Sequence, residues 1–440
     1  MLSLIPGRKR QLKSAHRTLA HLRTALNVPV SVKLWDGSQV PLGEDESPFS
    51  IAINGPGTIG SLIRQPTLEN VLRHYACGRL EIEGGDLIEF GDTARVQNSK
   101  ARMKQLNKWY LFRQMLPFVF AGADAAKVTH EFAGGDVQRK AGETAQNQDY
   151  IQFHYDLGND FYALFLGEEM QYSCAYFTDW QNTIDQAQHD KLDMICRKLR
   201  LKPDESFLDI GCGWGGLICH AAQHYGVVAH GVTLSQAQYD FVQAKIKRLG
   251  LEDRVLVELR DYSSLEGTYD KIASIGMFEH VGIANLPEYF KKLYSLLRDK
   301  GILLNHGITR GAKPDRKGFR KLRPEHKLIA KYIFPGAELD HIGHSVELME
   351  ASKFEVHDVE GWREHYAMTT RHWCQRLSAR KEEAIAMVGP ERYRLWVAYL
   401  AGVSFAFQDG SLRIFQVVAS KHASKGQSEL PQTRADLYAA

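Results

Sequence analysis

Short apolar runs and stretches of helical periodicity alternate through the second half of the chain. Strand-like runs begin at Phe207 and recur at Val227–Val232, Val255–Leu259, Lys271–Ile275, Gly301–His306, Phe354–Val359 and Arg413–Ala419. Apolar positions three and four apart predict helices around them, at Gln186–Leu199, Gly216–Tyr225, Gln236–Leu249 and Asn285–Leu297, and near residues 371–388 and 390–407. Strand alternating with helix predicts an α/β fold with a parallel, doubly wound sheet.

The first 120 residues follow a different pattern. Residues 8–27 carry leucines at helical spacing among Arg and Lys, which predicts an amphipathic helix with a basic outer face. We interpret it as a helix packed on its own domain, with contact to anionic lipid as the alternative. Short alternating strands broken by glycine turns follow from Val28 to Phe90, with helices near Pro66–Ala76 and Asn98–Phe118. This pattern predicts a small α+β domain.

The length of the chain and a change in composition suggest the domain boundaries. A chain of 440 residues exceeds what one hydrophobic core usually supports, so we expect two domains. Between Ala121 and Asn147 the residues are mostly Ala, Gly, Gln, Thr and Asp, which is typical of a linker. We therefore predict an α+β domain at 1–120, a linker at 121–147, an α/β domain at 148–420 and a loose polar tail at 421–440.

Composition narrows the class of protein. A hydrophobic share of 44% with 24% charged residues is typical of a soluble globular protein. The six cysteines show no paired metal-site spacing, so we expect reduced thiols and a cytoplasmic location. The N-terminal charges follow a very short apolar run, which is the wrong order for a secretory signal. The longest uncharged apolar run, Leu395–Phe407, has 13 residues, short of the ~20 that span a bilayer, so any membrane contact would be made from the surface.

The segment Phe207–Leu217 carries the main candidate for ligand binding. An apolar strand ends there at Asp209, and glycines at 211, 213 and 215 precede a helix that begins at Gly216. Glycine allows a tight bend and a close approach of the backbone to a ligand, and the start of a helix presents a positive dipole end. The segment is typical of a nucleotide-binding turn.

Two features decide which nucleotide we expect. The glycine spacing is not Gly-x-Gly-x-x-Gly, although a register with Gly216 in third place could imitate it. A dinucleotide site also requires an acid about 20 residues further on, at the end of the second strand. Here that strand ends in Gly231–Ser235 and has no acid. Together with Asp209 before the first glycine, this disfavours NAD and favours S-adenosylmethionine.

Five motifs also carry a family resemblance. They are His154–Asp156, Tyr172–Phe177, Asp209–Gly215, Thr233–Gln238 and Gly276–Gly282. In this order they resemble the cyclopropane fatty acid synthase family, which includes the mycolic acid cyclopropane synthases. The resemblance spans Phe153–Ala419 and implies a class I methyltransferase (Rossmann-like) fold. The N-terminal domain is matched more loosely, and its family counterpart resembles a small lipid-carrier fold that helps in forming a homodimer.

The resemblance implies a reaction in which a methylene group passes from S-adenosylmethionine to the cis double bond of an unsaturated phospholipid acyl chain. It also implies bicarbonate as the general base. Carried over position by position, the bicarbonate set is Cys174, Glu279, His306, the backbone amide of Ile308, and Tyr366. A thiol, an imidazole, a phenol and an amide can donate hydrogen bonds to an anion, and Glu279 would orient it.

Each of these residues also has an ordinary structural interpretation. Cys174 could be a small buried hydrophobe, and Tyr366 could serve only in packing. Glu279 and His306 are harder to explain in this way, because both follow predicted parallel strands at their carboxyl ends, where such sheets bind ligands.

The resemblance assigns the donor site residue by residue as well. Tyr155, Tyr172 and Ser173 would lie near the methionine group, and Asp209, Gly211 and Gly213 at the turn. Thr233, Ser235 and Gln238 would lie near the ribose, with Asp261 and Tyr262 around the adenine.

Basic charge is concentrated in residues 310–331, which we call the basic segment. It contains nine Lys or Arg and two acids, a net charge of +7, whereas the whole chain carries +3. Aromatic and aliphatic residues are interleaved with the charges, as expected of a segment that contacts an anionic membrane surface. A solvated face is the alternative. Nucleic acid would suit the same patch but not the lipid-family motifs, so we expect no nucleic-acid partner.

Together with the composition and the basic segment, the resemblance therefore implies a cytoplasmic S-adenosylmethionine-dependent cyclopropane-fatty-acyl-phospholipid synthase, bound peripherally to the inner face of the membrane. Two alternatives remain. One is a methyltransferase that acts on unsaturated acyl chains without closing the ring. The other is a non-catalytic lipid-binding protein, which would require a broken donor site.

Overall fold

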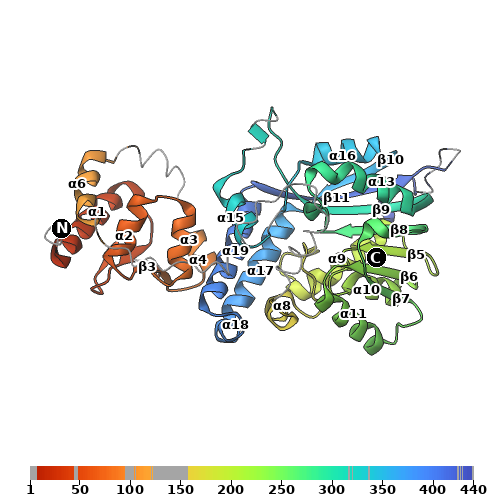
Figure 1. Ribbon diagram of the computed structural model, residues 1–440, viewed down its shortest axis with the longest axis horizontal. Coiled ribbons are helices and arrows are strands. Elements are labelled where there is room, and N and C mark those ends of the chain that lie inside the picture. Colours follow the sequence, from red (N-terminus) through yellow and green to blue (C-terminus); the bar gives the residue numbers. More distant parts are fainter. Residues whose placement is uncertain are drawn as a thin grey trace. The chain divides into compact units, whose positions relative to one another are not determined.

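The computed structural model describes residues 7–43, 48–94, 104, 106–119, 121, 157–315, 318–319, 321–334, 337–423, 426, 428 and 430–438 (Figure 1). The chain divides into two compact units. Of the described residues, unit 1 contains those up to 121 together with 374–401, and unit 2 contains 157–373 and those from 402 onward. Most of the predicted linker lies outside the described residues.

Unit 1 is an α+β module, as the sequence predicts. Its sheet has the order β2-β1-β3-β4, with β1 at Ser31–Lys33, β2 at Gln39–Pro41, β3 at Ser50–Ile53 and β4 at Leu80–Glu83. Its helices are α1 (Arg8–Leu26), α2 (Pro56–Arg64), α3 (Leu68–Ala76), α4 (Leu87–Ala94) and α6 (Lys108–Val119). The leucines of α1 pack on a core that includes Val30, Val32 and Phe118, which supports the interpretation of α1 as a helix packed on its own domain. Helix α2 is not predicted by the sequence pattern, because its first residues contain the turn-like Pro56 and Gly57.

Residues 374–401 lie in unit 1, although the predicted division placed them in the α/β domain. They comprise the end of α17 (Arg363–Ala379), all of α18 (Lys381–Val388) and the start of α19 (Pro390–Gln408). The guanidinium of Arg394 donates to Glu81 at 2.9 Å and to the carbonyl oxygen of Ala76 at 3.5 Å. These long-range bonds explain the difference, because periodicity identifies a helix but not its packing partners.

Unit 2 contains the predicted doubly wound sheet, of seven strands in the order β10-β11-β9-β8-β5-β6-β7. The strands are β5 (Ser206–Ile210), β6 (Val228–Thr233), β7 (Val255–Leu259), β8 (Tyr269–Ile275), β9 (Leu297–Arg310), β10 (Phe354–Gly361) and β11 (Leu412–Lys421). Strands β5 to β9 pair in parallel, whereas β11 pairs antiparallel with β9 and β10. The mostly parallel sheet between helical layers agrees with the class I methyltransferase fold.

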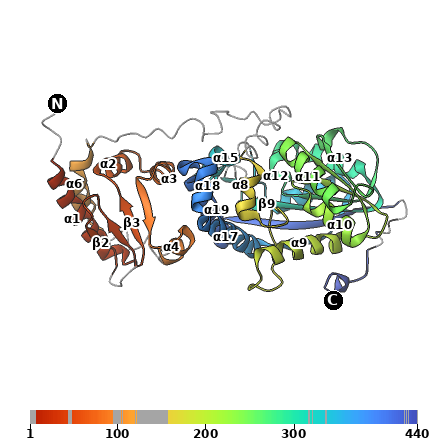
Figure 2. The same ribbon diagram turned by 90° about the horizontal axis from the view of Figure 1, so that it is seen from below.

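Helices cover both faces of this sheet (Figure 2). One face packs on α9 (Ile184–Leu199), α10 (Gly216–Tyr225) and α11 (Gln236–Leu249), and the other on α12 (Phe278–Val281), α13 (Leu286–Leu296) and α16 (Ile342–Ala351). Successive side chains of β5 point to opposite faces of the sheet. Phe207 packs in the core beneath α9, α10 and α11, and Leu208 packs in the core beneath α12, α13 and α16. Helices α8 (Asn159–Leu166) and α15 (Pro324–Tyr332) also belong to this unit, as do the start of α17 and the end of α19.

The polar tail is packed where it is described, which differs from the loose tail that the sequence suggested. Leu437 is buried, and Arg434 forms a 2.7 Å ion pair with Asp358. Arg200 pairs with Asp436 at 3.1 Å. Leu430 also packs against the core of unit 2, so apolar contacts and ion pairs hold a segment that is polar in composition. No helix in the described part of the chain is long and apolar enough to cross a bilayer.

Candidate active site

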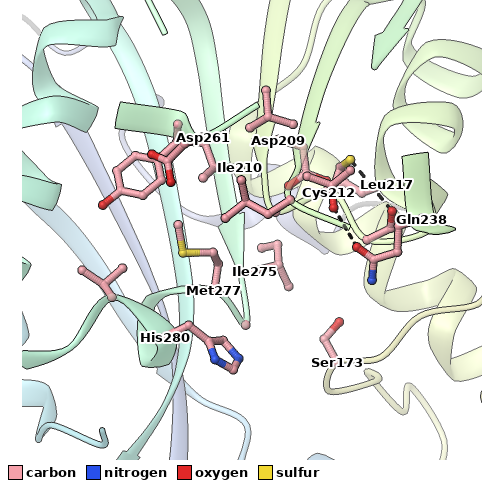
Figure 3. A pocket seen from close by; sticks show the side chains of 18 of the residues that line it. Ser173, Asp209, Ile210, Cys212, Leu217, Gln238, Asp261, Ile275, Met277 and His280 are labelled. Atoms are coloured by element: carbon pink, nitrogen blue, oxygen red, sulfur yellow. Dashed lines mark hydrogen bonds between the residues drawn. The ribbon is translucent and has the colours of Figure 1, made fainter. Parts of the chain in front are cut away.

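A cavity of about 610 Å³ lies at the carboxyl ends of β5, β6 and β8. This volume is within the range of small-molecule sites. Figure 3 shows Asp261, Met277 and His280 on one side of the cavity and Cys212 and Gln238 on the other. The predicted donor residues that line it are Tyr172, Ser173, Asp209, Gly211, Gly213, Thr233, Gln238, Asp261 and Tyr262. Tyr155 lies outside the described residues.

The glycine turn forms one wall of the cavity, and three of its glycines have a left-handed backbone. Gly211 has φ +78°, Gly213 has φ +55°, and Gly215 has φ +74° where α10 begins. A Cβ on Gly211 would also lie 3.0 Å from Cγ of Met277, across the turn. The left-handed conformation therefore favours glycine at 211, and an added Cβ would also force the Met277 side chain to shift.

Two buried ionisable groups face the cavity, Asp209 at the end of β5 and Lys191 on α9. Burial raises the pKa of Asp209 to about 7, and the nearby Lys191 opposes the rise. Burial lowers the pKa of Lys191 to about 7, opposed by Cys174, Asp209 and Glu169. Oδ1 of Asp209 has no partner among the described residues. This wall of the cavity can therefore pair with a polar ligand.

Lys191 lines the cavity but was not among the predicted site residues. Its Nζ donates to Oε1 of Gln171 at 2.6 Å and to Oγ of Ser173 at 3.1 Å, so it holds the segment that forms the cavity's edge. The signal was present in the helix pattern, because Lys191 falls on the apolar stripe of α9 with Ile184, Ala187 and Ile195. A lysine on an apolar stripe is rarely fully buried unless it is paired.

The end of β6 and the start of the next helix lie on the same side of the cavity as the glycine turn, and one predicted residue there does not line the cavity. The Thr233 hydroxyl donates to Oε1 of Gln238 at 2.8 Å, and both side chains line the cavity. Ser235, which was predicted near the ribose, is not among the lining residues. Its hydroxyl instead accepts from the backbone N–H of Gln238 and caps α11. The same residue types serve helix caps and ligand sites, so the motif alone did not separate the two roles.

The predicted bicarbonate set does not line this cavity. Its closest pair is Glu279, on α12 directly after β8, and Ile308 on β9. Oε1 of Glu279 accepts from the Ile308 backbone N–H at 2.5 Å, while Oε2 has no partner among the described residues. Burial raises the pKa of Glu279 to about 7, and the bond from Ile308 opposes the rise.

His306 lies on the same strand, two residues before Ile308. The ammonium of Lys198 donates to Oε1 of Gln416 at 2.7 Å, which leaves the Gln416 amide nitrogen to donate to Nδ1 of His306 at 3.0 Å. Burial holds the pKa of His306 well below its usual value, so the ring is neutral with its proton on Nε2. That Nε2 has no partner among the described residues, which leaves an unused buried donor.

Trp362 connects the rest of the set. Its ring centre lies 5.3 Å from that of His306, and its carbonyl oxygen lies 3.7 Å from Sγ of Cys174. Burial raises the pKa of Cys174 well above its usual value, so Cys174 is a thiol and a weak donor. Tyr366 is four residues further along, and its ring packs 4.6 Å from that of Phe407. The structure thus joins Glu279 to Ile308 directly, and Cys174 to His306 through Trp362.

Comparisons with known proteins agree on one family. The family model described as mycolic acid cyclopropane synthetase matches residues 142–417. A probable fatty acid methyltransferase of Pseudomonas putida is 37% identical over 420 residues, which cover 94% of this chain and 97% of that protein. The cyclopropane-fatty-acyl-phospholipid synthase of Escherichia coli strain K12 is 39% identical over 274 residues, 62% of this chain and 68% of that protein.

Solved structures resemble unit 2. The cyclopropane synthase MmaA2 from Mycobacterium tuberculosis is 33% identical with a TM-score of 0.60, over 62% of this chain and 98% of that one. The mycolic acid cyclopropane synthase CmaA1 complexed with SAH and CTAB is 35% identical with a TM-score of 0.59, with the same coverage.

Proposed function

Because this chain belongs to the mycolic acid cyclopropane synthetase family of S-adenosylmethionine-dependent enzymes, we propose that it converts the cis double bond of an unsaturated phospholipid acyl chain into a cyclopropane. The observation that carries the proposal is a ligand-sized cavity at the carboxyl end of a parallel sheet, next to a buried glutamate and histidine that each have an unused polar atom. His280 and Met277 line the cavity, so Glu279 lies between the cavity wall and β9.

The cavity suits the donor. Its volume accommodates a nucleoside, Gly211 allows close approach, and Oδ1 of Asp209 is a buried acceptor without a partner among the described residues. In this proposal Tyr172 and Ser173 hold the methionine group, Thr233 and Gln238 the ribose, and Asp261 and Tyr262 the adenine. When bound, S-adenosylmethionine supplies the electrophilic sulfonium methyl group. The chain's task is to hold the double bond in line with it and to exclude water.

Ring closure requires removal of a proton from the added methyl group. The predicted bicarbonate set, which lies outside the cavity lining, can meet part of this need. His306 offers an unused Nε2–H donor, and Cys174 and Tyr366 can supply further donors to bicarbonate, which would act as the base. Glu279, with its pKa near neutrality, can hold or release a proton at Oε2. The Ile308 amide is already engaged by Glu279, so in our proposal it orients the glutamate first.

Methylation without ring closure is the second candidate. It is favoured by the relatives that match nearly the whole chain, of which two are named probable fatty acid methyltransferases. Incubation with S-adenosylmethionine and vesicles of unsaturated phospholipid, followed by fatty-acid analysis, separates the candidates. Both products gain the mass of CH₂, but only ring closure removes the vinyl protons in NMR. A product that keeps vinyl protons would overturn the cyclopropane proposal, and no product would favour a non-catalytic lipid-binding protein.

We also propose that the basic segment contacts anionic lipid at the inner face of the membrane. In this proposal the enzyme is cytoplasmic and forms a homodimer. Five of its cations are exposed: Lys313, Lys321, Arg323, Lys327 and Lys331. Leu322, between two of them, is 39% exposed. Arg310 is different, because it lies 3.7 Å over the ring of Phe319 and donates to the carbonyl oxygen of Leu339. Residues 316, 317 and 320 lie outside the described part.

A further inference from the structure

Three histidines from two neighbouring helices come together away from the residues that line the cavity. His189 lies on α9, and His220 and His224 lie four residues apart on α10. Each offers one ring nitrogen, and these nitrogens all lie within 4.8 Å of one another. We propose that His189, His220 and His224 form a binding site for a divalent transition metal of the zinc class.

The arrangement of the rings supports this proposal. Residues four apart on a helix share one face, so His220 and His224 point to the same side of α10, with ring centres 4.4 Å apart. The ring of His189 approaches from α9, 5.1 Å from His220 and 6.0 Å from His224. Two neighbouring helices therefore supply three candidate nitrogen ligands.

His220 gives independent support, because its burial has no evident purpose otherwise. It is 5% exposed, and its Nε2 has no hydrogen-bond partner among the described residues. Leaving a buried polar atom unpaired costs free energy. A bound metal ion would give this buried ring nitrogen a partner.

Ligand type and geometry restrict the ion. Imidazole nitrogen suits Zn²⁺, Cu²⁺ and Ni²⁺, whereas Mg²⁺ and Ca²⁺ prefer oxygen. Tetrahedral coordination at about 2.0–2.1 Å requires nitrogens about 3.4 Å apart. The largest closing movement is therefore about 1.4 Å, which rotation of the exposed rings of His189 and His224 can supply. A fourth position is left for water.

A bound ion would cross-link α9 to α10, the helix that begins directly after the glycine turn. The two helices already pack through Leu192 and Ile218 in one core, so the metal would reinforce an existing contact. It would stabilise the folded state, because the unfolded chain does not bring the three rings together.

The test uses tag-free full-length protein stripped of metal with a chelator. We expect isothermal titration with Zn²⁺ to show one site per chain, and Zn²⁺ to raise the melting temperature. His224→Gln removes an exposed ring and should fold normally. Because loss of a residue that only supports a metal ligand already weakens metal binding about 10–100-fold, loss of a ligand itself should weaken Zn²⁺ binding by at least that much. His220→Gln should have the same effect on binding. His422→Gln, an exposed histidine outside the trio, should leave binding unchanged.

Three results would overturn the proposal. The first is that the parent protein does not bind Zn²⁺. The second is that His224→Gln binds Zn²⁺ as tightly as His422→Gln does. The third is that the parent binds Mg²⁺ or Ca²⁺ as tightly as Zn²⁺, which would indicate oxygen ligands elsewhere. If His220→Gln fails to fold, His224→Gln alone decides the outcome.

Discussion

Glu279 provides a sharp test, because the burial that suits it to proton exchange near neutral pH also costs stability. Its side chain is 4% exposed, and only Oε1 has a hydrogen-bond partner among the described residues. Glu279→Gln keeps an acceptor for the Ile308 amide and removes the ionisation. We therefore expect the variant to be more stable than the parent at alkaline pH while it loses activity.

The magnitude follows from the raised pKa. A carboxyl with a higher pKa in the folded state contributes stability that is fully present below its unfolded value of 4.5 and is lost as pH rises through about 7. The difference corresponds to about 3 kcal/mol, at about 1.4 kcal/mol for each pKa unit. The variant's free energy of unfolding should exceed that of the parent by about 3 kcal/mol at pH 8 and by less than about 1 kcal/mol at pH 5.

Urea unfolding of both proteins between pH 5 and pH 8 measures this gap. The matched control is Glu347→Gln, which removes an exposed carboxylate from α16 and should change stability by less than about 0.5 kcal/mol at either pH. In the same variant of Glu279, turnover should fall at least about 100-fold. The affinity for S-adenosylhomocysteine should not change, because Glu279 does not line the cavity.

The reasoning would be refuted if the stability gap did not widen between pH 5 and pH 8, since Glu279 would then ionise as an exposed carboxyl does. Unchanged turnover would remove Glu279 from the proton-transfer role. Loss of S-adenosylhomocysteine binding would instead make Glu279 a structural support of the donor site.

Three further predictions concern the donor site and the lipid surface. Gly211→Ala should abolish donor binding in calorimetry and lower the free energy of unfolding by at least about 1 kcal/mol, because of the positive φ at 211 and the contact with Met277. The control Gly402→Ala, in an exposed helical position, should raise the free energy of unfolding by about 0.5–1 kcal/mol. Equal effects of the two changes would refute the role of the turn. Lys191→Met should weaken donor binding about tenfold, since it releases Ser173, while Lys198→Met, a buried lysine of the same helix outside the cavity, should not; equal affinities would make Lys191 only structural. Alanine at the five exposed cations of the basic segment should reduce sedimentation with anionic vesicles at least tenfold and remove most of its salt dependence, and unchanged binding would exclude this surface.

The strands of unit 2 along the chain, the glycine turn and most of the donor wall could be predicted from the sequence, whereas the position of each strand in the sheet and the antiparallel pairing of β11 could not. Their signals are local: short apolar runs mark the parallel strands of unit 2, and the carboxyl ends of parallel strands meet at one edge of the sheet. Asp209, Thr233 and Asp261 each lie at such an end, so their convergence on one cavity followed from the topology alone.

Tertiary structure decided which polar groups are available. Ser235 matches the donor motif, yet its hydroxyl caps α11, and the Ile308 amide is engaged by Glu279. Lys191 became a site residue only because α9 packs its apolar stripe against the cavity edge. Residues 374–401 joined unit 1 through bonds such as that of Arg394 to Glu81. Sequence spacing records the periodicity of each element, whereas hydrogen-bond partners and burial depend on which elements meet, and that is settled only when the chain is packed.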